Sequence, residues 1–423
     1  MVSSLLIRQM HRNVHRNAPS LASIHRWYTN NSQNSTISRN KPKRRIIDLR
    51  SDTVTQPTQS MLRCALNAKT GDDVFCEDPS VLHLEERTAD LFGMEAGLFV
   101  PTGTMSNLIS VLSHCDSRAS EIVIGANSHM CLWEGGGASN LGGIHTRQIV
   151  ENPNDGTMRL DAIRDLIRRD GDVHHPTTEL ICLENTHNAL GGVVLPSQYL
   201  ANVRSIADDM DGVKVHIDGA RIFNALVALT NDDVGVSSSA AIDMCTGGAH
   251  SVSVCLSKGL GAPLGGLLVG DIEFIRLARR ARKRVGGGMR QVGVVASMGT
   301  YALEHHVDRL VEDHCRAKRI ARALVDNGFI QPQGGNVSTN IVYFALPQRI
   351  PPSRTSSHVT TMMQGKEFCE RLEREYGVKI LWGFGEGGTL FRIVTHMDIL
   401  DDDVDTAIEA ILQLSGGEGG TED

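Results

Sequence analysis

From about residue 46 to residue 300, short apolar runs alternate with helical patterns and glycine-rich turns. Apolar residues recur at helical spacing over 160–169 and 198–210. The short runs suit strands buried on both faces, and they occupy residues 121–125, 180–184, 213–218, 251–256 and 267–270. This alternation predicts an α/β domain around a largely parallel sheet, in which ligand groups lie at the carboxyl ends of the strands.

The pattern changes near residue 301. A helical pattern runs over 301–326, strand-like segments follow at 340–344 and 389–394, and another helix is expected between them. We interpret the Pro/Ser-rich segment 347–357 as a surface insertion. We therefore expect a large domain over 46–300, a smaller α+β domain over 301–415 and a disordered Gly/Glu-rich tail over 416–423.

Charge is distributed unevenly along the 423 residues. The first 45 hold seven arginines, two lysines and no acidic residue, so they carry +9 in a chain of net charge −7, which leaves −16 for the remainder. Arg8, Arg12 and Arg16 recur every four residues, opposite a row of apolar residues, as on an amphipathic helix. This composition is typical of a mitochondrial transit peptide, and we expect the protein in the mitochondrial matrix.

A disordered basic tail that binds nucleic acid or nothing, on a cytoplasmic protein, is the alternative interpretation of residues 1–45. The acidic remainder argues against nucleic-acid binding by the folded part. No run of 18 apolar residues occurs, so no membrane span is predicted. Nine cysteines without a CxxC pair indicate reduced thiols in an intracellular compartment.

Lys258 is the residue that most strongly indicates chemistry. It follows the predicted strand 251–256 and Ser257, and it is the only formally charged residue between Asp243 and Asp271. Lysines in apolar surroundings can act as Schiff-base nucleophiles, because burial favours the neutral amine. A lysine at a strand end that reaches water is the alternative.

Asp218 lies at the end of the predicted strand 213–218 and is followed by Gly-Ala-Arg221. A carboxylate in this position can hold the ring nitrogen of a cofactor protonated, and the arginine can bind an oxygen anion. Aspartate followed by glycine at a strand end is also an ordinary turn.

Residues 101–107 join a strand-like segment at 97–100 to a predicted helix. Gly103 allows a close approach of the backbone, and Thr104 can cap the helix. Free N–H groups at the start of that helix would form a phosphate site. Strand–turn–helix caps without a ligand are common, so this signal is weak by itself.

Two histidines and an arginine complete the candidates. His129 follows the predicted strand 121–125, His187 follows the predicted strand 180–184, and Arg392 lies in a third strand-like segment. Histidines at strand ends are more often structural than functional. His129, Cys131 and Glu134 could suggest a metal site, but nothing nearby completes the ligands, and no metal is predicted.

Other cofactor patterns are absent. The chain has no phosphate-loop, HExxH or GxSxG pattern, and residues 259–264 lack the last glycine of a dinucleotide fingerprint, which excludes a nicotinamide-dependent dehydrogenase. A phosphate turn, a carboxylate for a ring nitrogen, a histidine to lie against the ring and a lysine, all at strand ends, are together the groups that pyridoxal 5'-phosphate (PLP) requires.

The stretches around these residues resemble the low-specificity L-threonine aldolases, which are aspartate-aminotransferase-like (fold type I) PLP enzymes. The matching stretches follow the family order over roughly residues 46–410: 48–55, 71–79, 101–104, 183–188, 216–225, 255–263, 286–291 and 392–396. The resemblance implies the PLP-dependent transferase-like fold, with a large domain built on a mostly parallel sheet and a smaller α+β domain.

The resemblance also implies cofactor-binding roles. Lys258 would form the Schiff base with PLP, and Asp218 would bond the pyridine nitrogen. Arg221 would bond the ring hydroxyl or the substrate carboxylate. His129 would stack on the ring, and the turn of Gly103 and Thr104 would bind the phosphate.

Substrate-binding roles follow from the same resemblance. Ser51 and Arg392 match positions that hold the substrate carboxylate, for which a planar guanidinium suits a two-point contact. His187 matches a histidine on the substrate side and is the candidate to bond the β-hydroxyl. His129 or a bound water is the rival for the general base.

The implied reaction is retro-aldol cleavage of L-threonine, L-allo-threonine and related β-hydroxy-α-amino acids to glycine and an aldehyde, which would degrade threonine and supply glycine. A β-eliminating lyase or a racemase on the same scaffold is the alternative, and a non-catalytic homologue is a further one. We expect a homotetramer or homodimer with sites between subunits. The chain departs from the family pattern at Phe75-Cys76, where many relatives have Tyr-Gly.

Overall fold

The computed structural model describes residues 45–416, apart from 118, 170, 232–237, 333–335 and 348–357. The predicted targeting segment 1–45, insertion 347–357 and tail 416–423 lie outside the described residues, except for one boundary residue of each. All elements named below belong to the compact unit that begins at Ile46.

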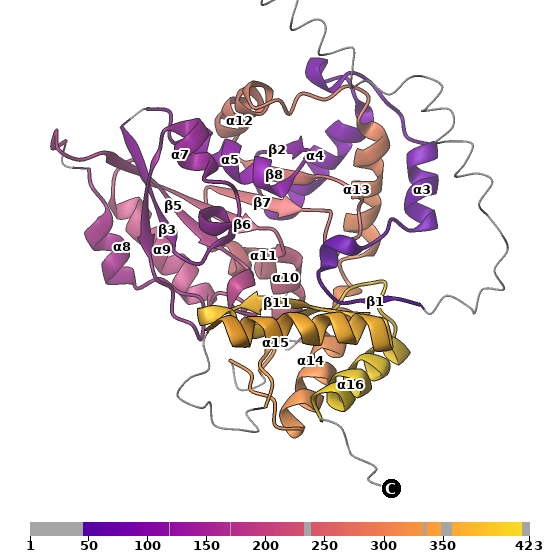
Figure 1. The fold of residues 1–423 in the computed structure, drawn as a ribbon. Helices are drawn as coiled ribbons and strands as arrows, with labels where there is room; N and C mark the ends of the chain where they lie inside the picture. Colours follow the sequence, from indigo (N-terminus) through magenta and orange to yellow (C-terminus); the bar gives the residue numbers. More distant parts are fainter. Residues whose placement is uncertain are drawn as a thin grey trace, which may run out of the picture. The chain divides into compact units, whose positions relative to one another are not determined.

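Seven strands form the main sheet in the order β2-β8-β7-β6-β5-β3-β4 (Figure 1). They are β2 Ala96–Val100, β3 Ser120–Gly125, β4 His145–Ile149, β5 Thr177–Glu184, β6 Lys214–Gly219, β7 Ser251–Cys255 and β8 Gly266–Gly270. Strands β7, β6, β5, β3 and β4 pair in parallel, whereas β8 runs antiparallel to β2 and β7. The predicted α/β fold with a mostly parallel sheet is confirmed, as are the five strands predicted from apolar runs.

Helices cover both faces of this sheet because successive strand residues point to opposite sides. In β3, Val123 packs into the largest core together with residues of α9 and α10. Its neighbours Ile122 and Ile124 pack into a second core with Val111 of α5. With both faces buried, the strand ends are where polar side chains of the sheet can meet a ligand.

The helices are α3 Gln59–Leu66, α4 Pro79–Phe92, α5 Gly103–His114, α6 His129–Leu132, α7 Gly137–Gly142, α8 Leu160–Leu166, α9 Ser197–Asp209, α10 Ile222–Asn231, α11 Ser238–Thr246, α12 Ile272–Arg284, α13 Gly293–His305, α14 Leu310–Asp326, α15 His358–Arg371 and α16 Asp401–Ser415. The prediction of one helix over 301–326 is wrong. The chain breaks between α13 and α14, where His306 is buried and its Nδ1 lies 2.7 Å from the carbonyl oxygen of Leu260. No glycine or proline marks this break, because a distant contact sets it.

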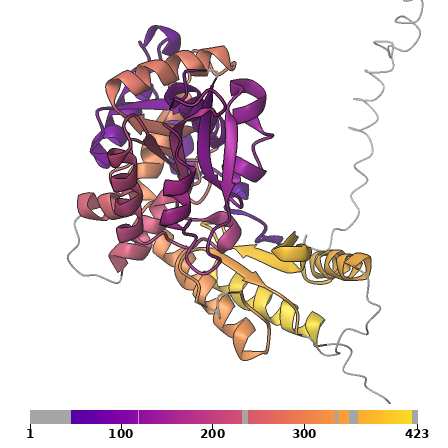
Figure 2. The same ribbon diagram turned by 90° about the vertical axis from the view of Figure 1, so that its left-hand side faces the viewer.

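The C-terminal elements surround a core of their own (Figure 2). Strands β9 Ile341–Phe344, β11 Leu381–Phe384 and β12 Leu390–Val394 form an antiparallel sheet. The first described strand, β1 Ile47–Asp48, pairs with β10 Val378–Lys379, and Ile47 and Leu49 pack into this C-terminal core. The first residues of the unit therefore lie with its last elements.

All nine cysteines are free thiols. None of the described helices is both long enough and apolar enough to cross a membrane.

The side chain of Asp78 links helices α4 and α13. Its Oδ1 caps α4 by accepting from the backbone N–H groups of Ser80 and Val81, at 3.1 and 3.2 Å. Its Oδ2 accepts from the N–H of Gly293, the first residue of α13, at 2.8 Å. A Cβ at Gly293 would lie 2.2 Å from this carboxylate, so only glycine fits there.

We expect Asp78→Ala to lower the free energy of unfolding by about 2–4 kcal/mol, because it removes a helix cap and leaves a buried N–H without an acceptor. Urea unfolding followed by circular dichroism measures this loss. The control is Asp271→Ala, which removes only the exposed cap of α12 and should cost about 1 kcal/mol. Equal losses in the two variants would contradict the linking role of Asp78.

Candidate active site

Most of the predicted site residues meet at one edge of the main sheet. Asp218 lies within β6 and is 2% exposed. Lys258 follows β7, His129 follows β3 and begins α6, and His187 follows β5. Because these strands run in parallel, their carboxyl ends lie at the same edge.

Lys258 stands at this edge with its ammonium group unengaged. No described residue accepts a hydrogen bond from it or forms an ion pair with it, while its backbone carbonyl accepts from the hydroxyl of Thr55 at 3.0 Å. Its positive charge acts on both Asp52 and His129, since it helps to lower the pKa of Asp52 and opposes the rise in the pKa of His129. The amine is therefore close to the charged groups of the site and available for a covalent bond.

Asn107, on the buried face of α5, orients Asp218. Its amide nitrogen donates to Oδ2 of Asp218 at 2.9 Å and to Oε1 of Glu134 at 2.8 Å. Its amide oxygen accepts from the hydroxyl of Ser253 at 2.7 Å and lies 3.3 Å from Nε2 of His216. These contacts fix both ends of the amide and hold the Asp218 carboxylate in one orientation.

Glu134 also binds His129. Oε1 of Glu134 lies 3.0 Å from Nδ1 of His129, and the hydrogen bond is the main reason why the pKa of His129 is raised. Burial, reinforced by the charge of Asp218, raises the pKa of Glu134 despite its hydrogen bonds. The polar atoms of His129, Glu134 and Asp218 lie within 4.8 Å of one another. Because Asn107 donates an N–H to each carboxylate, the cluster is a hydrogen-bonded network.

The start of α5 lies beside the end of β7. A Cβ on Gly103 would be 3.8 Å from Sγ of Cys255, the last residue of β7. The predicted cap at Thr104 is wrong: Thr102 caps α5, with its Oγ1 accepting from the N–H of Met105 at 3.1 Å. The helix begins two residues earlier than a cap at Thr104 would place it, so the N–H groups of Gly103 and Thr104 belong to its first turn and have no partner within the helix.

Arg221 forms a buried ion pair that the sequence did not suggest. Its Nε and Nη2 donate to the two carboxylate oxygens of Asp52 at 2.7 and 2.6 Å, and Asp52 is fully buried. Burial alone would raise the pKa of Asp52, but Arg221 and, more weakly, Lys258 lower it below its ordinary value. Ser51 caps the short turn Asp52–Val54 that carries this carboxylate.

Arg392 lies beside Arg221, and Asn188 joins them. Oδ1 of Asn188 accepts from Nη1 of Arg221 at 3.2 Å and from Nη1 of Arg392 at 3.4 Å. Arg392 also donates to the carbonyl of Arg50 and stacks over the ring of Phe384, 4.6 Å from its centroid. Its Nε is buried and has no hydrogen-bond partner in the described part of the chain, and no described carboxylate pairs with it. Arg392 is thus a cation that can accept an anionic ligand.

His187 is at the same edge but is turned into the protein. Its side chain is 2% exposed, and Nε2 lies 3.2 Å from Oε1 of Glu151. Burial alone lowers the pKa of His187, but Glu184, Glu151 and Asp218 outweigh it and raise the pKa. Its Nδ1 is buried and has no hydrogen-bond partner among the described residues.

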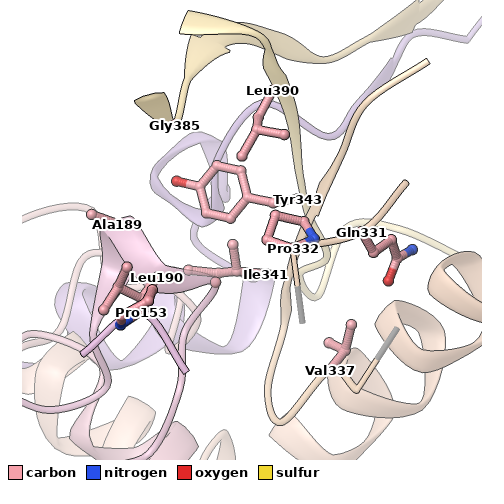
Figure 3. A pocket seen from close by; sticks show the side chains of 11 residues that line it. Pro153, Ala189, Leu190, Gln331, Pro332, Val337, Ile341, Tyr343, Gly385 and Leu390 are labelled. Carbon is pink, nitrogen blue, oxygen red and sulfur yellow. The ribbon is translucent and has the colours of Figure 1, made fainter. Parts of the chain in front are cut away.

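A mostly apolar pocket of about 220 Å³ lies between the turn after β5 and strands β9 and β12 (Figure 3). In Figure 3, Tyr343 and Ile341 face Ala189 and Leu190 across it. The hydroxyl of Tyr343 donates to the carbonyl oxygen of Asn188 at 3.4 Å, so one wall of the pocket contacts the residue that joins the two guanidinium groups.

Sequence reasoning missed the polar residues that hold the predicted ones: Asp52, Asn107, Glu134 as a partner of His129, Glu151 and Asn188. Asp52 and Asn188 lie inside the matching stretches and were detectable as charged or amide residues beside predicted ones. Glu151 follows β4, whose polar sequence His145–Ile149 gave no strand signal.

Comparison with known proteins shows the class. The sequence model of the β-eliminating lyase family matches residues 48–347. The fold resembles that of a putative L-allo-threonine aldolase from Listeria monocytogenes, with a TM-score of 0.66 and 19% identity over 87% of this chain and 96% of that one. The chain belongs to the β-eliminating lyase family and has the fold of the type I PLP enzymes.

Closer relatives define the family within this class. The chain is 44% identical to the probable low-specificity L-threonine aldolase 2 of Arabidopsis thaliana, over 88% of this chain and 97% of the relative. It is 45% identical to the low specificity L-threonine aldolase of Escherichia coli K12, over 67% of this chain and 80% of the relative. The chain belongs to the low-specificity L-threonine aldolase family.

We expect Asp52→Asn to lower the free energy of unfolding by about 3–5 kcal/mol, because it leaves the buried charge of Arg221 without its counter-ion. The control is Asp161→Asn, which breaks a pair of the same two-point geometry with Arg159 on the surface and should cost less than about 1 kcal/mol. Guanidinium unfolding measures both. If the two losses are alike, the Asp52–Arg221 pair does not stabilise this region.

Proposed function

We propose that the chain binds PLP at this edge of the sheet and cleaves L-threonine, L-allo-threonine and related β-hydroxy-α-amino acids to glycine and an aldehyde. The observation that carries the proposal is the juxtaposition of an unengaged lysine, Lys258, with a fixed buried carboxylate, Asp218, at neighbouring strand ends. Identity above 40% to proteins named low-specificity L-threonine aldolases supports the reaction.

The residues present fit the cofactor. When bound, PLP supplies an aldehyde for a Schiff base and an electron-poor ring that accepts the electron pair of the breaking bond. Lys258 is the proposed attachment residue, and Asp218 the partner of the ring nitrogen. The free N–H groups of Gly103 and Thr104 suit a phosphate at the start of α5. His129, with a partly exposed ring, is proposed to stack on the cofactor.

The substrate carboxylate is proposed to bind Arg392, with Ser51 beside it. The buried Nε of Arg392 without a partner supports this role, because such a donor is costly unless a ligand satisfies it. Arg221 is already engaged by Asp52, which leaves its Nη1 as the atom for the ring hydroxyl or the carboxylate. His187 is proposed to bind on the β-hydroxyl side.

Acetaldehyde release from L-threonine tests the proposal. We expect the wild-type chain to release it and Lys258→Ala to lose activity by more than the roughly 10²–10⁴-fold that general-base help contributes. Lys318→Ala, at an exposed position on α14, should retain full activity.

A yellow wild-type protein that releases no aldehyde would contradict the proposed reaction, and pyruvate or an inverted amino acid would then indicate β-elimination or racemisation. A protein that stays colourless with added PLP would contradict the cofactor assignment.

The same proposal includes assembly and location. Assembly as a homotetramer or homodimer with sites between subunits is supported by membership of the family, and degradation of threonine to supply glycine follows from the proposed reaction. The basic, acid-free composition of residues 1–45 supports import into the mitochondrial matrix.

We expect a fluorescent reporter fused to residues 1–45 to enter mitochondria. The same fusion carrying Arg8→Asp, Arg12→Asp and Arg16→Asp should remain in the cytosol, because it loses the basic face of the predicted helix. Fluorescence microscopy with a mitochondrial marker measures both. A cytosolic wild-type fusion would contradict the targeting proposal.

A further inference from the structure

Cleavage of the substrate requires a base for the proton of its β-hydroxyl. Two histidines lie at the edge that carries Lys258 and Asp218, and they differ in access. The side chain of His129 is 33% exposed, whereas that of His187 is 2% exposed. An imidazole must be reachable by the substrate to take its proton, so access favours His129.

Glu134 determines which nitrogen of His129 carries the proton. A single oxygen, Oε1, faces both Nδ1 of His129 at 3.0 Å and the amide nitrogen of Asn107 at 2.8 Å. The amide is a donor, so Oε1 accepts from it, and when Glu134 is ionised it can only accept from His129 as well, which makes Nδ1 the protonated ring nitrogen. The neutral ring then has its lone pair on Nε2.

The direction of the Asn107 amide is itself fixed by its hydrogen-bond partners. Its oxygen accepts from the hydroxyl of Ser253, and its nitrogen lies between two carboxylates. A flipped amide would place its oxygen against both Glu134 and Asp218. The tautomer of His129 is therefore imposed by a network that reaches Asp218 on β6, two strands away from β3 in the sheet.

The charges around His129 make it a stronger base. Glu134 and Asp218 both favour the imidazolium and raise the pKa of His129, whereas Lys258 and burial oppose them. Glu184 faces the same residue from β5, where its Oε2 accepts the backbone N–H of His129 at 2.5 Å. Of these groups, Glu134 alone bonds the ring.

We propose that Glu134 is the positioning residue that makes His129 the general base: it holds Nδ1–H and leaves Nε2 to accept the β-hydroxyl proton. In this step the O–H bond breaks and an N–H bond forms at Nε2. The Cα–Cβ bond would break as the aldehyde carbonyl forms, and bound PLP would accept the electron pair of that bond. The inference rests on the proposed function and extends it to the identity of the base.

His187 is arranged in the opposite way. In His187 it is Nε2 that is bonded to a carboxylate, that of Glu151, and Nδ1 that has no hydrogen-bond partner among the described residues. The whole side chain is buried. This second carboxylate–histidine pair holds the loop after β5 in place and sets the position of Asn188, which begins the next turn. His187 therefore shapes the substrate side without receiving the proton.

The test is Glu134→Gln, which keeps an amide oxygen for His129 and Asn107 but removes the charge. The first measurement is the pH dependence of diethyl pyrocarbonate modification of His129 in the cofactor-free protein, followed by peptide mass spectrometry. We expect the midpoint to move to lower pH than in the wild type. The control is Glu121→Gln, another buried carboxylate on β3, which bonds Thr178 and should leave the midpoint unchanged.

The second measurement is the pH profile of threonine cleavage by the PLP-loaded enzyme. In Glu134→Gln we expect kcat to fall about tenfold or more. We also expect the acid limb of the profile, the pH range over which kcat falls on acidification, to move to lower pH, because a weaker base is titrated at lower pH. KM and the exchange of the α-proton of glycine, which has no β-hydroxyl, should change by less than about threefold. His129→Asn should abolish the acid limb.

An unchanged midpoint and an unchanged acid limb in Glu134→Gln would overturn the inference, as would an equal loss of glycine exchange. If Glu134→Gln fails to fold, Asn107→Asp, which removes the donor that orients Glu134, must shift the same midpoint. If the wild type binds PLP but does not cleave threonine, the proposed function fails, while the modification midpoint still reports on the Glu134–His129 pair.

Discussion

The parallel pairing of β7, β6, β5 and β3 is the constraint on which the site depends. Helices bury both faces of these strands, whose apolar residues pack into the cores on the two sides of the sheet. Chemistry is therefore confined to the residues at or just after the carboxyl ends. Four segments far apart in the sequence reach one edge through this geometry alone, and they carry His129, His187, Asp218 and Lys258.

The second constraint is a set of side-chain hydrogen bonds that link this edge of the sheet to the C-terminal elements. Asp52 lies just after β1, the strand that pairs with β10, and it bonds Arg221 beyond the end of β6. Asn188, after β5, is bonded by Arg221 and by Arg392 of β12. The carboxylate of Asp52 and the amide of Asn188 thus connect the main sheet to the first and the last elements of the described chain. Through Asn188, the guanidinium group of Arg392 lies beside that of Arg221.

The sequence predicted the parts of this arrangement that leave a local signal. Lys258 stood out because it follows a predicted strand and is the only formally charged residue between Asp243 and Asp271, and Asp218 because it ends a predicted strand and is followed by Gly-Ala-Arg221. The polar strand β4 gave no such signal, so Glu151 after it was missed. The break between α13 and α14 was missed because the contact of His306 with Leu260, distant in the sequence, sets it.

Partners within the site were harder to predict for the same reason. Asn107 is one of several polar residues on α5, and only the position of β6 shows that it bonds Asp218. The pairing of Asp52 with Arg221 spans 169 positions in the sequence. Resemblance to a family supplied residue positions, but the directions of the amide and carboxylate groups come from the packing.

The balance of charge within the described site indicates which groups are kept for a ligand. Asp52 is neutralised by Arg221, and Glu134 and Glu151 each hold a histidine. Burying a charge without a partner is costly, and the chain avoids that cost at these carboxylates. Lys258 and Arg392 are the exceptions, since no described carboxylate pairs with either. A cofactor aldehyde and a substrate carboxylate are the two groups that would satisfy them, so the charges left unpaired match the ligands of the proposed reaction.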